Sequence, residues 1–378
     1  MKIIAIDATS IVNTGGFTHL YNLIESFNRN FHPNIKKLIV FSSKTVLDKL
    51  SDHRFLNKKS HYFLNKGKFH RIFFQLFILD TLLKKNKVDI LLSTTGDYLG
   101  NFRPYVAISQ NMLLYEKDFW KDIDSLKEKF RLWINFHRQK KCFKSASGLI
   151  FLSKYAKKFI IKELRLENIP NKVIHHGVSP IFFNDNFKIN HIIQNNKNTL
   201  KLIYVSTVHV YKNQWNVIDA VWKLRQNGAN VSLTLIGPII YTPSGEKLFS
   251  KIREKDPERE FVNYIPEVPY EELPAYYSKH DAIIYASSCE NMPNILIESM
   301  ASGLPIICSN KQPMPEFLKK GGYYFNAKSA DSIKQAIEEL LDDTDVHIKI
   351  KQNLCEVNKL KWENTSKKTF SFISNLIK

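Results

Sequence analysis

Short apolar runs alternate with amphipathic stretches along most of the chain, and this alternation predicts parallel α/β structure. In the first half, helical periodicity fills several intervals between the runs, notably residues 17–28 and 126–142. The order of elements indicates a doubly wound α/β domain. The strands that we expect there lie at residues 2–6, 37–41, 89–92, 105–109 and 148–152, with a last strand and turn at 173–177.

A second alternation of the same kind begins at residue 200, after a polar, Asn-rich stretch at 179–198 that predicts a linker. The predicted elements of this half are strands at 200–206, 231–236, 260–264, 281–286 and 305–308, and helices at 214–227 and 270–278. We therefore expect α/β domains at 1–178 and 199–358, followed by a closing helix at 359–378.

Size and composition fit a globular protein with two cores. The chain has 378 residues, of which 44% are hydrophobic and 12% aromatic, and this composition excludes disorder. No run reaches the roughly 20 apolar residues of a membrane-spanning helix, and the short strand-like opening at residues 1–7 leads us to expect no secretory signal. The four cysteines lie far apart and lack the paired spacing of a metal site. We therefore expect a reduced cytoplasmic protein, and we expect Cys289 to be a buried structural thiol.

The formal net charge of +19 favours anionic partners. Nucleotide substrates, an anionic membrane surface and nucleic acid are the physical candidates. No nucleic-acid-binding motif is present, so we expect no nucleic-acid partner. The alternative explanation is compositional, because the chain is rich in Lys, Asn, Ile and Phe, as are proteins from AT-rich genomes.

Residues 120–144 mix large apolar and basic side chains at helical spacing, which is typical of a helix lying on a membrane surface. The alternative is a helix packed on the core of its domain with a solvated basic side, as Leu132 and Phe136 favour. The side chains that could share a membrane-facing surface are Leu126, Phe130, Trp133 and Ile134, flanked by Lys127, Arg131 and Arg138.

Two glutamates lie between two predicted strands of the second half. Glu290 follows the run 282–286, and Glu298 comes eight positions later, inside a predicted helix that stops before the run 305–308. Strand, helix and strand in this order form a parallel βαβ unit, which binds ligands beyond the carboxyl ends of its strands. Pro293 suits the first helical position, so the free amides of residues 294–296 would face an anion.

This acidic pair resembles that of the retaining nucleotide-sugar glycosyltransferases of family 4. The resemblance implies the GT-B architecture, in which two Rossmann-like domains face each other across a cleft and the closing helix packs back on the first domain. It also implies that Glu290 reaches the donor sugar and that Glu298 holds the nucleotide ribose. The neighbours expected to share in donor binding are Asn291, Met292, Asn294 and Ile295.

The segment after the first strand of the second domain also resembles the family. Lys212 matches a Lys that binds the donor phosphates, where positive charge stabilises the departing diphosphate. Ser206 and Thr207 stand where the family has a Gly–Arg pair. Either a hydroxyl group substitutes for the missing arginine, or His209 or another cation supplies the positive charge. The turn at Gly237 is a further expected donor-binding position.

Other resemblances lie in loops after strands. Thr14, Gly15 and Gly16 resemble a Gly–Gly loop that faces the donor diphosphate, since glycines permit close approach of the backbone. Gln110 and Asn111 stand where many members carry a His, and we expect them to hydrogen-bond sugar hydroxyls.

Two further positions have structural explanations as well. Ser153 matches a family Ser at the head of a helix, and we expect it to cap that helix. Glu316 matches a Glu that bounds the nucleotide pocket, although the preference of an acidic residue for a helix start explains it equally.

The leading hypothesis is a metal-independent retaining glycosyltransferase of surface-polysaccharide synthesis, such as that of O-antigen or capsule. It would move a sugar from a nucleoside diphosphate donor to a glycan or lipid-linked acceptor, without a cofactor, in the cytoplasm or at the inner face of the plasma membrane. The chain has Asp-x-Asp triplets at residues 122–124 and 343–345. Neither follows a predicted strand, where a metal–diphosphate site would lie. The alternatives are a GT-B-fold sugar-nucleotide epimerase and a sugar-nucleotide-binding protein without turnover, which the missing arginine at Thr207 favours.

Overall fold

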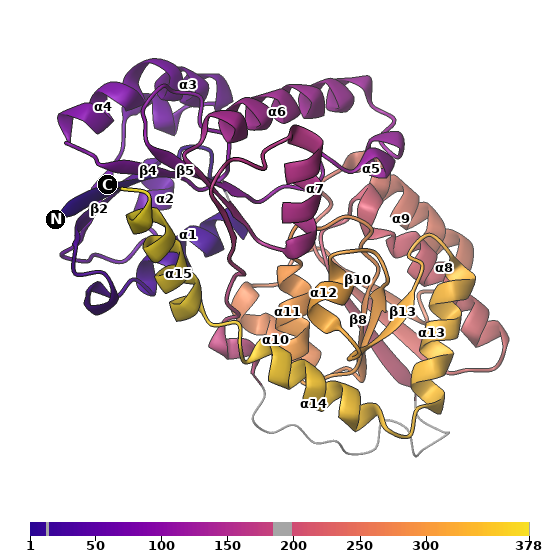
Figure 1. Ribbon diagram of the computed structural model, residues 1–378. Helices are drawn as coiled ribbons and strands as arrows, with labels where there is room; N and C mark the ends of the chain where they lie inside the picture. The colour runs from indigo at the N-terminus through magenta and orange to yellow at the C-terminus, as the bar shows by residue number, and fades with distance from the viewer. Residues whose placement is uncertain (13–14, 184–198, 378) are drawn as a thin grey trace. The chain divides into compact units, whose positions relative to one another are not determined.

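The structure is a computed structural model that describes residues 1–12, 15–183 and 199–377 (Figure 1). The chain forms two compact units: the first contains 1–115, 125–177 and 360–378, and the second contains 116–124 and 178–359. Most of the predicted linker, residues 184–198, lies outside the described residues.

Seven parallel strands of the described residues form the sheet of the first unit, in the order β3-β2-β1-β4-β5-β6-β7. Helices cover both faces, so the central strands are mostly apolar, with polar residues such as Asp7 and Ser93 at their carboxyl ends. Ile4, at 0% exposure, pairs with Leu38 on one side and Ile90 on the other. The strands are β1 (Lys2–Asp7), β2 (Ile35–Phe41), β3 (Leu56–Lys59), β4 (Ile90–Ser93), β5 (Tyr105–Ser109), β6 (Gly148–Phe151) and β7 (Asn171–Val173).

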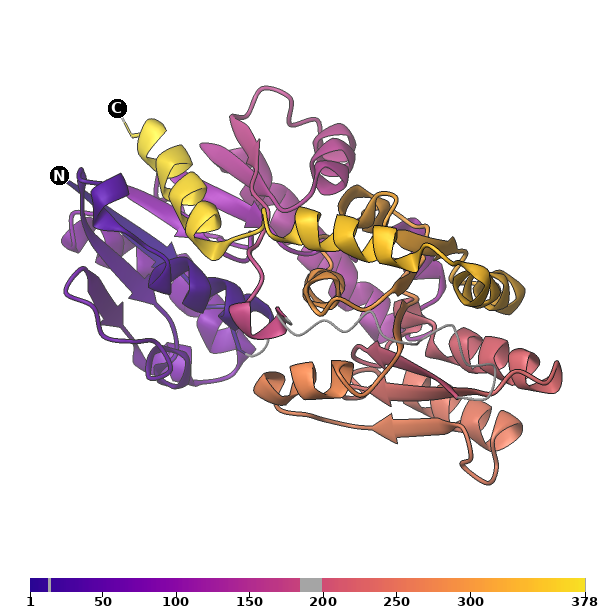
Figure 2. The same ribbon diagram turned by 90° about the horizontal axis from the view of Figure 1, so that it is seen from below.

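The closing helix α15 lies beside α1 in this unit (Figures 1 and 2). The Ser366 hydroxyl donates a hydrogen bond to the carbonyl oxygen of Leu23 at 3.0 Å. The helices of the unit are α1 (Gly15–Glu25), η1 (Arg29–Phe31), α2 (Lys44–Leu47), η2 (Tyr62–Asn65), α3 (Lys68–Phe73), the π-helical η3 (Phe74–Ile78), α4 (Leu79–Lys85), α6 (Leu126–Ser145), α7 (Lys154–Leu164) and α15 (Trp362–Asn375). As predicted, Ser153 caps α7, since its hydroxyl accepts from the N–H of Ala156 at 3.1 Å.

Helix α6 has one buried and one exposed apolar side. Leu132 and Phe143 are buried against the unit, whereas the four side chains of the predicted membrane-facing surface are exposed. The prediction for Arg138 is wrong: it does not lie on the outer flank, because it turns toward the unit, where its Nη2 lies 3.3 Å from Oδ2 of Asp97. The exposed fractions are 81% for Leu126, 62% for Phe130, 51% for Trp133 and 39% for Ile134.

Six parallel strands of the described residues form the second sheet, in the order β10-β9-β8-β11-β12-β13. Its central strands are also mostly apolar, with Ile203, Ile284 and Ile307 at 0% exposure. The strands are β8 (Leu200–Val205), β9 (Val231–Ile236), β10 (Val262–Ile265), β11 (Ala282–Tyr285), β12 (Ile306–Ser309) and β13 (Gly322–Phe325). The expectation of two parallel α/β sheets is confirmed.

The helices of the second unit form two groups, of which α8, α9 and α13 pack together and α11, α12 and α14 pack together. They are α5 (Lys117–Lys121), η4 (Pro180–Phe182), η5 (Val210–Lys212), α8 (Gln214–Gln226), α9 (Thr242–Lys255), η6 (Tyr270–Glu272), α10 (Leu273–Tyr277), α11 (Asn294–Ala301), α12 (Met314–Leu318), α13 (Ala330–Asp342) and α14 (Val346–Val357). Helix α9 was not predicted, because its first turn, Thr-Pro-Ser-Gly, carries the residues typical of a turn.

Residues 116–124 lie within the predicted first domain but pack with the second unit. The ring of Phe119 lies 5.7 Å from that of Tyr211, centroid to centroid. Asp122 accepts from Lys328 at 2.8 Å. These contacts attach α5 to the second unit, although its neighbours in sequence belong to the first.

Candidate active site

The loops after β8 and β11 meet where the strand order of the second sheet reverses. These two strands are neighbours, and the chain continues from β8 to β9 on one side and from β11 to β12 on the other. A crevice forms at such a reversal, beyond the carboxyl ends of the strands, and is the usual ligand site of doubly wound folds. Lys212 and Glu290 come from these two loops.

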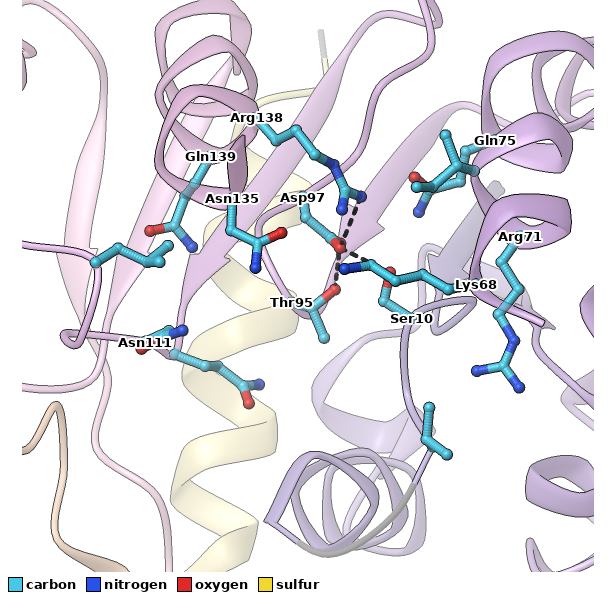
Figure 3. A pocket seen from close by; sticks show the side chains of 14 residues that line it. Ser10, Lys68, Arg71, Gln75, Thr95, Asp97, Asn111, Asn135, Arg138 and Gln139 are labelled. Atoms are coloured by element: carbon cyan, nitrogen blue, oxygen red, sulfur yellow. Dashed lines mark hydrogen bonds and ion pairs between the residues drawn. The ribbon is translucent and has the colours of Figure 1, made fainter. Parts of the chain in front are cut away.

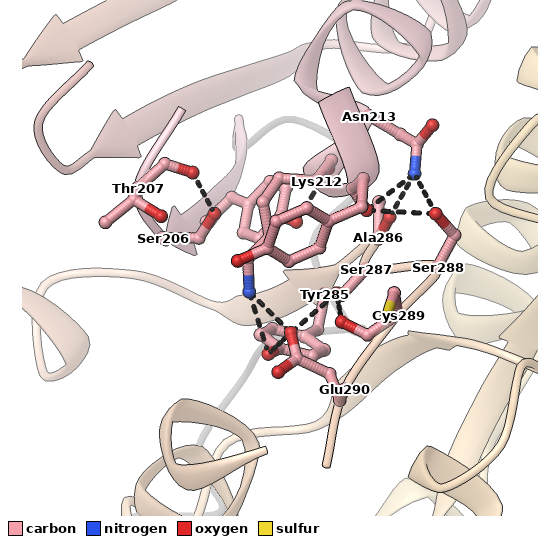
Figure 4. A network of polar contacts seen from close by, with 12 residues as sticks. Ser206, Thr207, Lys212, Asn213, Tyr285, Ala286, Ser287, Ser288, Cys289 and Glu290 are labelled. Atoms are coloured by element: carbon pink, nitrogen blue, oxygen red, sulfur yellow. Dashed lines mark hydrogen bonds and ion pairs between the residues drawn. The ribbon is translucent and has the colours of Figure 1, made fainter. Parts of the chain in front are cut away.

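Lys212 and Glu290 form a buried ion pair at this point (Figure 4). Nζ of Lys212 lies 2.5 Å from Oε1 of Glu290, and the side chains are only 6% and 15% exposed. The same oxygen accepts from the hydroxyls of Tyr285 at 2.7 Å and Ser287 at 2.6 Å. Three donors on one carboxylate oxygen hold Glu290 in a single orientation, and charge-assisted hydrogen bonds of this kind are strong.

Asn213 ties the two loops together. Its φ of 54° lies in the left-handed region, which Asn adopts more readily than most residues. In this conformation its Nδ2 donates to the carbonyl oxygen of Ala286 at 2.9 Å and to Ser288 Oγ at 3.3 Å. The N–H of Ser288 donates in turn to the carbonyl oxygen of Tyr211 at 2.8 Å. The ion pair is therefore positioned by backbone contacts before any ligand arrives.

Gly237 allows the loop after β9 to pass against the loop after β8. It has a φ of 142°, and a Cβ atom there would lie 2.2 Å from the carbonyl oxygen of Ser206. Only glycine fits this position. The buried Ser206 hydroxyl accepts from Gln214 at 3.1 Å, and the same amide group donates to the carbonyl oxygen of Thr207 at 3.0 Å. The roles of Ser206, Thr207 and Gly237 in donor binding stay predictions.

His209 packs within an aromatic cluster. Its ring stacks on that of Tyr241 at 5.2 Å and lies 5.5 Å from that of Phe119. Its Nδ1 accepts from the N–H of Val210 at 2.9 Å. These contacts account for the position of His209 in the unit, and its compensation for the missing arginine stays a prediction.

Glu298 is a buried carboxyl group on α11, with 8% of the residue exposed. The hydroxyl of Tyr270 donates to its Oε1 at 2.8 Å. Burial raises the pKa of Glu298 to about 7, against the opposing effect of the Tyr270 hydrogen bond. Hydroxyl groups of a ligand that donate to this carboxylate would favour its ionised form, because a hydrogen bond to the charged state lowers a pKa.

The start of α11 differs from the prediction by one residue. Pro293 precedes the helix, with φ −82° and ψ 83°, and the first helical residue is Asn294. The N–H of Asn294 donates to the carbonyl oxygen of Met292 at 3.0 Å, so the prediction that this amide is free is wrong. This hydrogen bond of the Asn294 amide belongs to the turn that leads into the helix. Asn291 and Met292 are buried in that turn, and Ile295 is half-buried in the first helical turn.

Glu316 lies at the start of a short helix, its role at the nucleotide pocket stays a prediction, and Cys289 is a buried thiol. Glu316 lies in the short helix α12, and its N–H donates to the carbonyl oxygen of Pro313 at 2.9 Å, as at a helix start. Cys289 is buried, and burial raises the pKa of its thiol well above the usual range, so it is a poor nucleophile. Among the described residues, no cluster of three or more His, Cys, Asp and Glu side chains could hold a metal ion.

Gly15 and Gly16 form the first turn of α1, which begins at Gly15 and not, as predicted, at Phe17. Among the described residues, a Cβ atom at Gly15 would meet nothing within 4 Å, and one at Gly16 would meet only Ile11, at 3.7 Å. The fold itself therefore does not require glycine here, and the missing side chains leave space for a ligand. Thr14 lies outside the described residues.

Gln110 lies beside a buried histidine. Its Nε2 is 3.1 Å from Nδ1 of His19, whose ring stacks on that of His176 at 4.6 Å. Burial lowers the pKa of His19 well below the usual range, so this imidazole is neutral at physiological pH. Gln110 and Asn111 also line a cavity of about 570 Å³ in the first unit.

Three residues of the site were not predicted. Ser287 and Tyr285 border the segment that carries Glu290, and the spacing of a hydroxyl three residues before a carboxylate was an available signal. Tyr270 had no sequence signal, since it meets Glu298 across 28 positions of the chain.

Residues 185–356 match a family model described as Glycosyl transferases group 1. Two curated proteins are similar to part of the chain. O-antigen chain mannosyltransferase B of Escherichia coli is 25% identical over 171 residues, which cover 45% of this chain and 44% of that protein. A GDP-mannose-dependent alpha-(1-6)-phosphatidylinositol monomannoside mannosyltransferase of Mycobacterium tuberculosis is 26% identical, covering 35% and 36%. The match thus spans less than half the length of these relatives.

Solved structures resemble the whole chain in fold. The sucrose-phosphate synthase of Thermosynechococcus elongatus superposes with a TM-score of 0.78 at 14% identity, covering 100% of this chain and 99% of that one. Anabaena HepE in complex with UDP and glucose gives a TM-score of 0.71 at 15% identity, covering 99% and 100%. At these identities, the likeness shows the fold alone.

Proposed function

This chain belongs to the glycosyl transferases group 1 and has the GT-B fold, and from this premise we propose that it transfers a sugar from a nucleoside diphosphate donor to a glycan or lipid-linked acceptor. The observation that carries the proposal is the buried pair of Lys212 and Glu290 at the strand-order reversal, with Glu298 following on α11. A cation, a carboxylate and a second, buried carboxyl group suit a phosphate, a sugar and a ribose, respectively.

We propose that Lys212 binds the donor diphosphate, as a cation aimed at the oxygen on which charge develops. Lys212 contacts Glu290 in the structure. When the donor binds, its phosphate oxygens would replace Glu290 as the partner of Nζ, and Glu290 would then accept hydrogen bonds from the sugar hydroxyls. The bond between the anomeric carbon and the diphosphate breaks, and the acceptor oxygen bonds to that carbon on the same face. The acceptor proton passes to the departing phosphate.

For the donor, we propose GDP-mannose. The E. coli relative is named as an O-antigen mannosyltransferase, and the M. tuberculosis relative as GDP-mannose-dependent. The same relatives support a place in surface-polysaccharide synthesis. O-antigen chain mannosyltransferase RfbU of Salmonella typhimurium is 35% identical to this chain over 79 residues, and this short similarity supports the same role.

The correct nucleoside diphosphate sugar is expected to raise the melting temperature, because it binds only the folded state. At a concentration of 100 Kd, the stabilisation is about 2.7 kcal/mol. Thermal shift with GDP-mannose, UDP-glucose and their free nucleotides measures this effect, with the unphosphorylated nucleosides as controls. Release of GDP or UDP in the presence of acceptor then separates an enzyme from a sugar-nucleotide-binding protein. If none of these nucleotides shifts the melting temperature, the proposal is wrong.

We also propose peripheral contact of α6 with an anionic membrane. Its exposed side chains, among them Phe130 at 62% and Trp133 at 51%, form an apolar surface in a chain of net charge +19. Aromatic and basic side chains together bind the interface of anionic bilayers. Among the described residues, no helix combines the length and apolar character needed to cross a bilayer.

Liposome flotation is expected to recover the protein with vesicles that contain anionic lipid, and less of it at high salt. Replacing both Phe130 and Trp133 by Ser should abolish recovery, because it removes most of the inserted aromatic surface. Ile348→Ser is the matched control, since Ile348 is 56% exposed on α14. Equal recovery with neutral lipid, or no recovery with either lipid, would contradict binding to an anionic membrane. The net positive charge would then be explained by amino-acid composition alone.

A further inference from the structure

The cavity of about 570 Å³ in the first unit opens at the carboxyl ends of β1, β4 and β5, where the strand order of that sheet reverses (Figure 3). Helix α3 borders it with Lys68 and Arg71, and α6 borders it with Arg138. Asp97 is the single carboxylate among its lining residues, so the three cations leave the lining with a formal charge of +2.

Asp97 offsets one of the three positive charges through its ion pair with Arg138, and Lys68 and Arg71 have no second carboxylate among the lining residues. Asp97 accepts from Ser10 at 2.7 Å and from Thr95 at 2.5 Å, in addition to its ion pair with Arg138 at 3.3 Å. Burial, followed by the charges of Arg138 and Arg131, lowers the pKa of Lys68. An anion bound among these cations would relieve their mutual repulsion.

Three residues that line the cavity also carry buried polar atoms without a hydrogen-bond partner in the described part of the chain. Nε of Arg71 and Nε of Arg138 are buried without a hydrogen-bond partner among the described residues. Gln75, at 1% exposure, donates through Nε2 to Asp7 at 3.1 Å and to Thr9 at 2.7 Å, and its Oε1 has no partner in the same part of the chain. Buried polar atoms in proteins are nearly always paired, so these three atoms leave hydrogen-bonding capacity beside the cavity.

The conformation of the helix places Gln75 at the cavity. It lies in η3, a π-helical stretch between α3 and α4, and such stretches occur frequently at functional sites. Lys68, Arg71 and Gln75 therefore follow one another along the same side of a continuous helix. The opposite side carries the exposed rings of Phe69 and Phe73.

We propose that this cavity binds an anionic group, a phosphate or a carboxylate, on the acceptor glycan. Lys68, Arg71 and Arg138 bind the anion, and Oε1 of Gln75 accepts a hydrogen bond from a neighbouring sugar hydroxyl. The inference rests on the proposed function only in naming the ligand as the acceptor. Guanidinium groups suit both anions, because their planar N–H groups match two oxygens at once.

The test is binding of three small probes to the full chain by ligand-observed NMR: glucose 1-phosphate, glucuronate and glucose. We expect the two anions to bind and the neutral sugar to bind at least about tenfold more weakly, with affinity for the anions falling as salt rises. Comparison of the two anions tells phosphate from carboxylate. A vesicle-borne lipid phosphate as competitor tells a membrane-anchored acceptor from a free one.

The variants are Lys68→Gln and Arg71→Gln, each expected to weaken anion binding about tenfold, the loss typical of one charge-assisted contact. Lys85→Gln is the matched control, because this exposed lysine lies on α4, farther along the same run of helix and outside the cavity lining. Melting temperatures check that all three variants are folded.

Equal binding of glucose and the anions, no binding of any probe, or unchanged anion affinity in both cavity variants would overturn the inference. Failure of the proposed function is recognised separately, by nucleotide sugars that do not bind the wild-type protein. Anion binding by the cavity is measured without a nucleotide, so either result can stand without the other.

Discussion

Replacing Lys212 by Met is expected to lower the turnover number about 100- to 1,000-fold, the loss typical of one group that stabilises developing charge. The same substitution should destabilise the fold, because it leaves Glu290 buried without its cation. Breaking a buried ion pair from one side costs about 3–5 kcal/mol. Initial rates of nucleotide release at saturating donor, with thermal unfolding of the same samples, measure the two effects.

A double variant separates them. Adding Glu290→Gln to Lys212→Met removes the unpaired carboxylate and keeps a side chain able to accept from the hydroxyls of Tyr285 and Ser287. We expect most of the lost stability to return while turnover stays low. Lys223→Met is the control, since this lysine forms a partly exposed pair with Asp331 at 2.6 Å. Turnover that recovers together with stability would show that Lys212 acts only through folding.

Glu298→Gln is expected to stabilise the free protein at pH 8 and to weaken nucleotide binding. The folded-state pKa of Glu298 is raised to about 7 from an ordinary 4.5, so the protonated form favours folding. The penalty of the buried charge is therefore fully present above pH 7 and disappears as the pH falls below 4.5. Removing it should add up to about 3 kcal/mol at pH 8, and nothing near pH 4.

Nucleotide affinity should fall by about 1.5–3 kcal/mol in the same variant, because the ribose loses a charge-assisted acceptor. Denaturant unfolding at several pH values and isothermal titration with GDP and UDP measure the two changes. Glu246→Gln, at an exposed position of α9, should alter neither. A variant that gains no stability at pH 8, or that keeps full nucleotide affinity, would contradict the role of Glu298 as a buried carboxyl group kept for the ribose.

The predictions for Lys212 and Glu298 concern buried charged residues that lower the stability of the fold but that the proposed function requires. A buried ion pair and a buried carboxyl group are less favourable to folding than apolar residues of the same size. Glu290 and Glu298 lie in one βαβ unit, and Lys212 reaches Glu290 from the loop after the neighbouring strand β8. These buried charged groups distinguish the site from the rest of the second sheet, whose central strands are mostly apolar.

Most strands could be predicted from the sequence, because each is a short apolar run whose signal lies within itself. The strands β5 and β9 match their predicted residues, Tyr105–Ser109 and Val231–Ile236. Strand β3 could not be found in this way, since Leu56–Lys59 has a single apolar residue and is half-buried at the edge of the sheet. Its pairing with β2, and not its own composition, makes it a strand.

Apolar runs and short motifs are local properties, so the amino-acid sequence was enough to predict the two α/β sheets, and its resemblance to family 4 was enough to single out Glu290, Glu298 and Lys212. Only the tertiary structure brought Lys212 within 2.5 Å of Glu290, 78 positions away, since that contact depends on β8 lying next to β11. In the same way, Arg138 faces Asp97 across 41 positions. Contacts between distant segments follow from strand order and helix packing, and no window of sequence contains either.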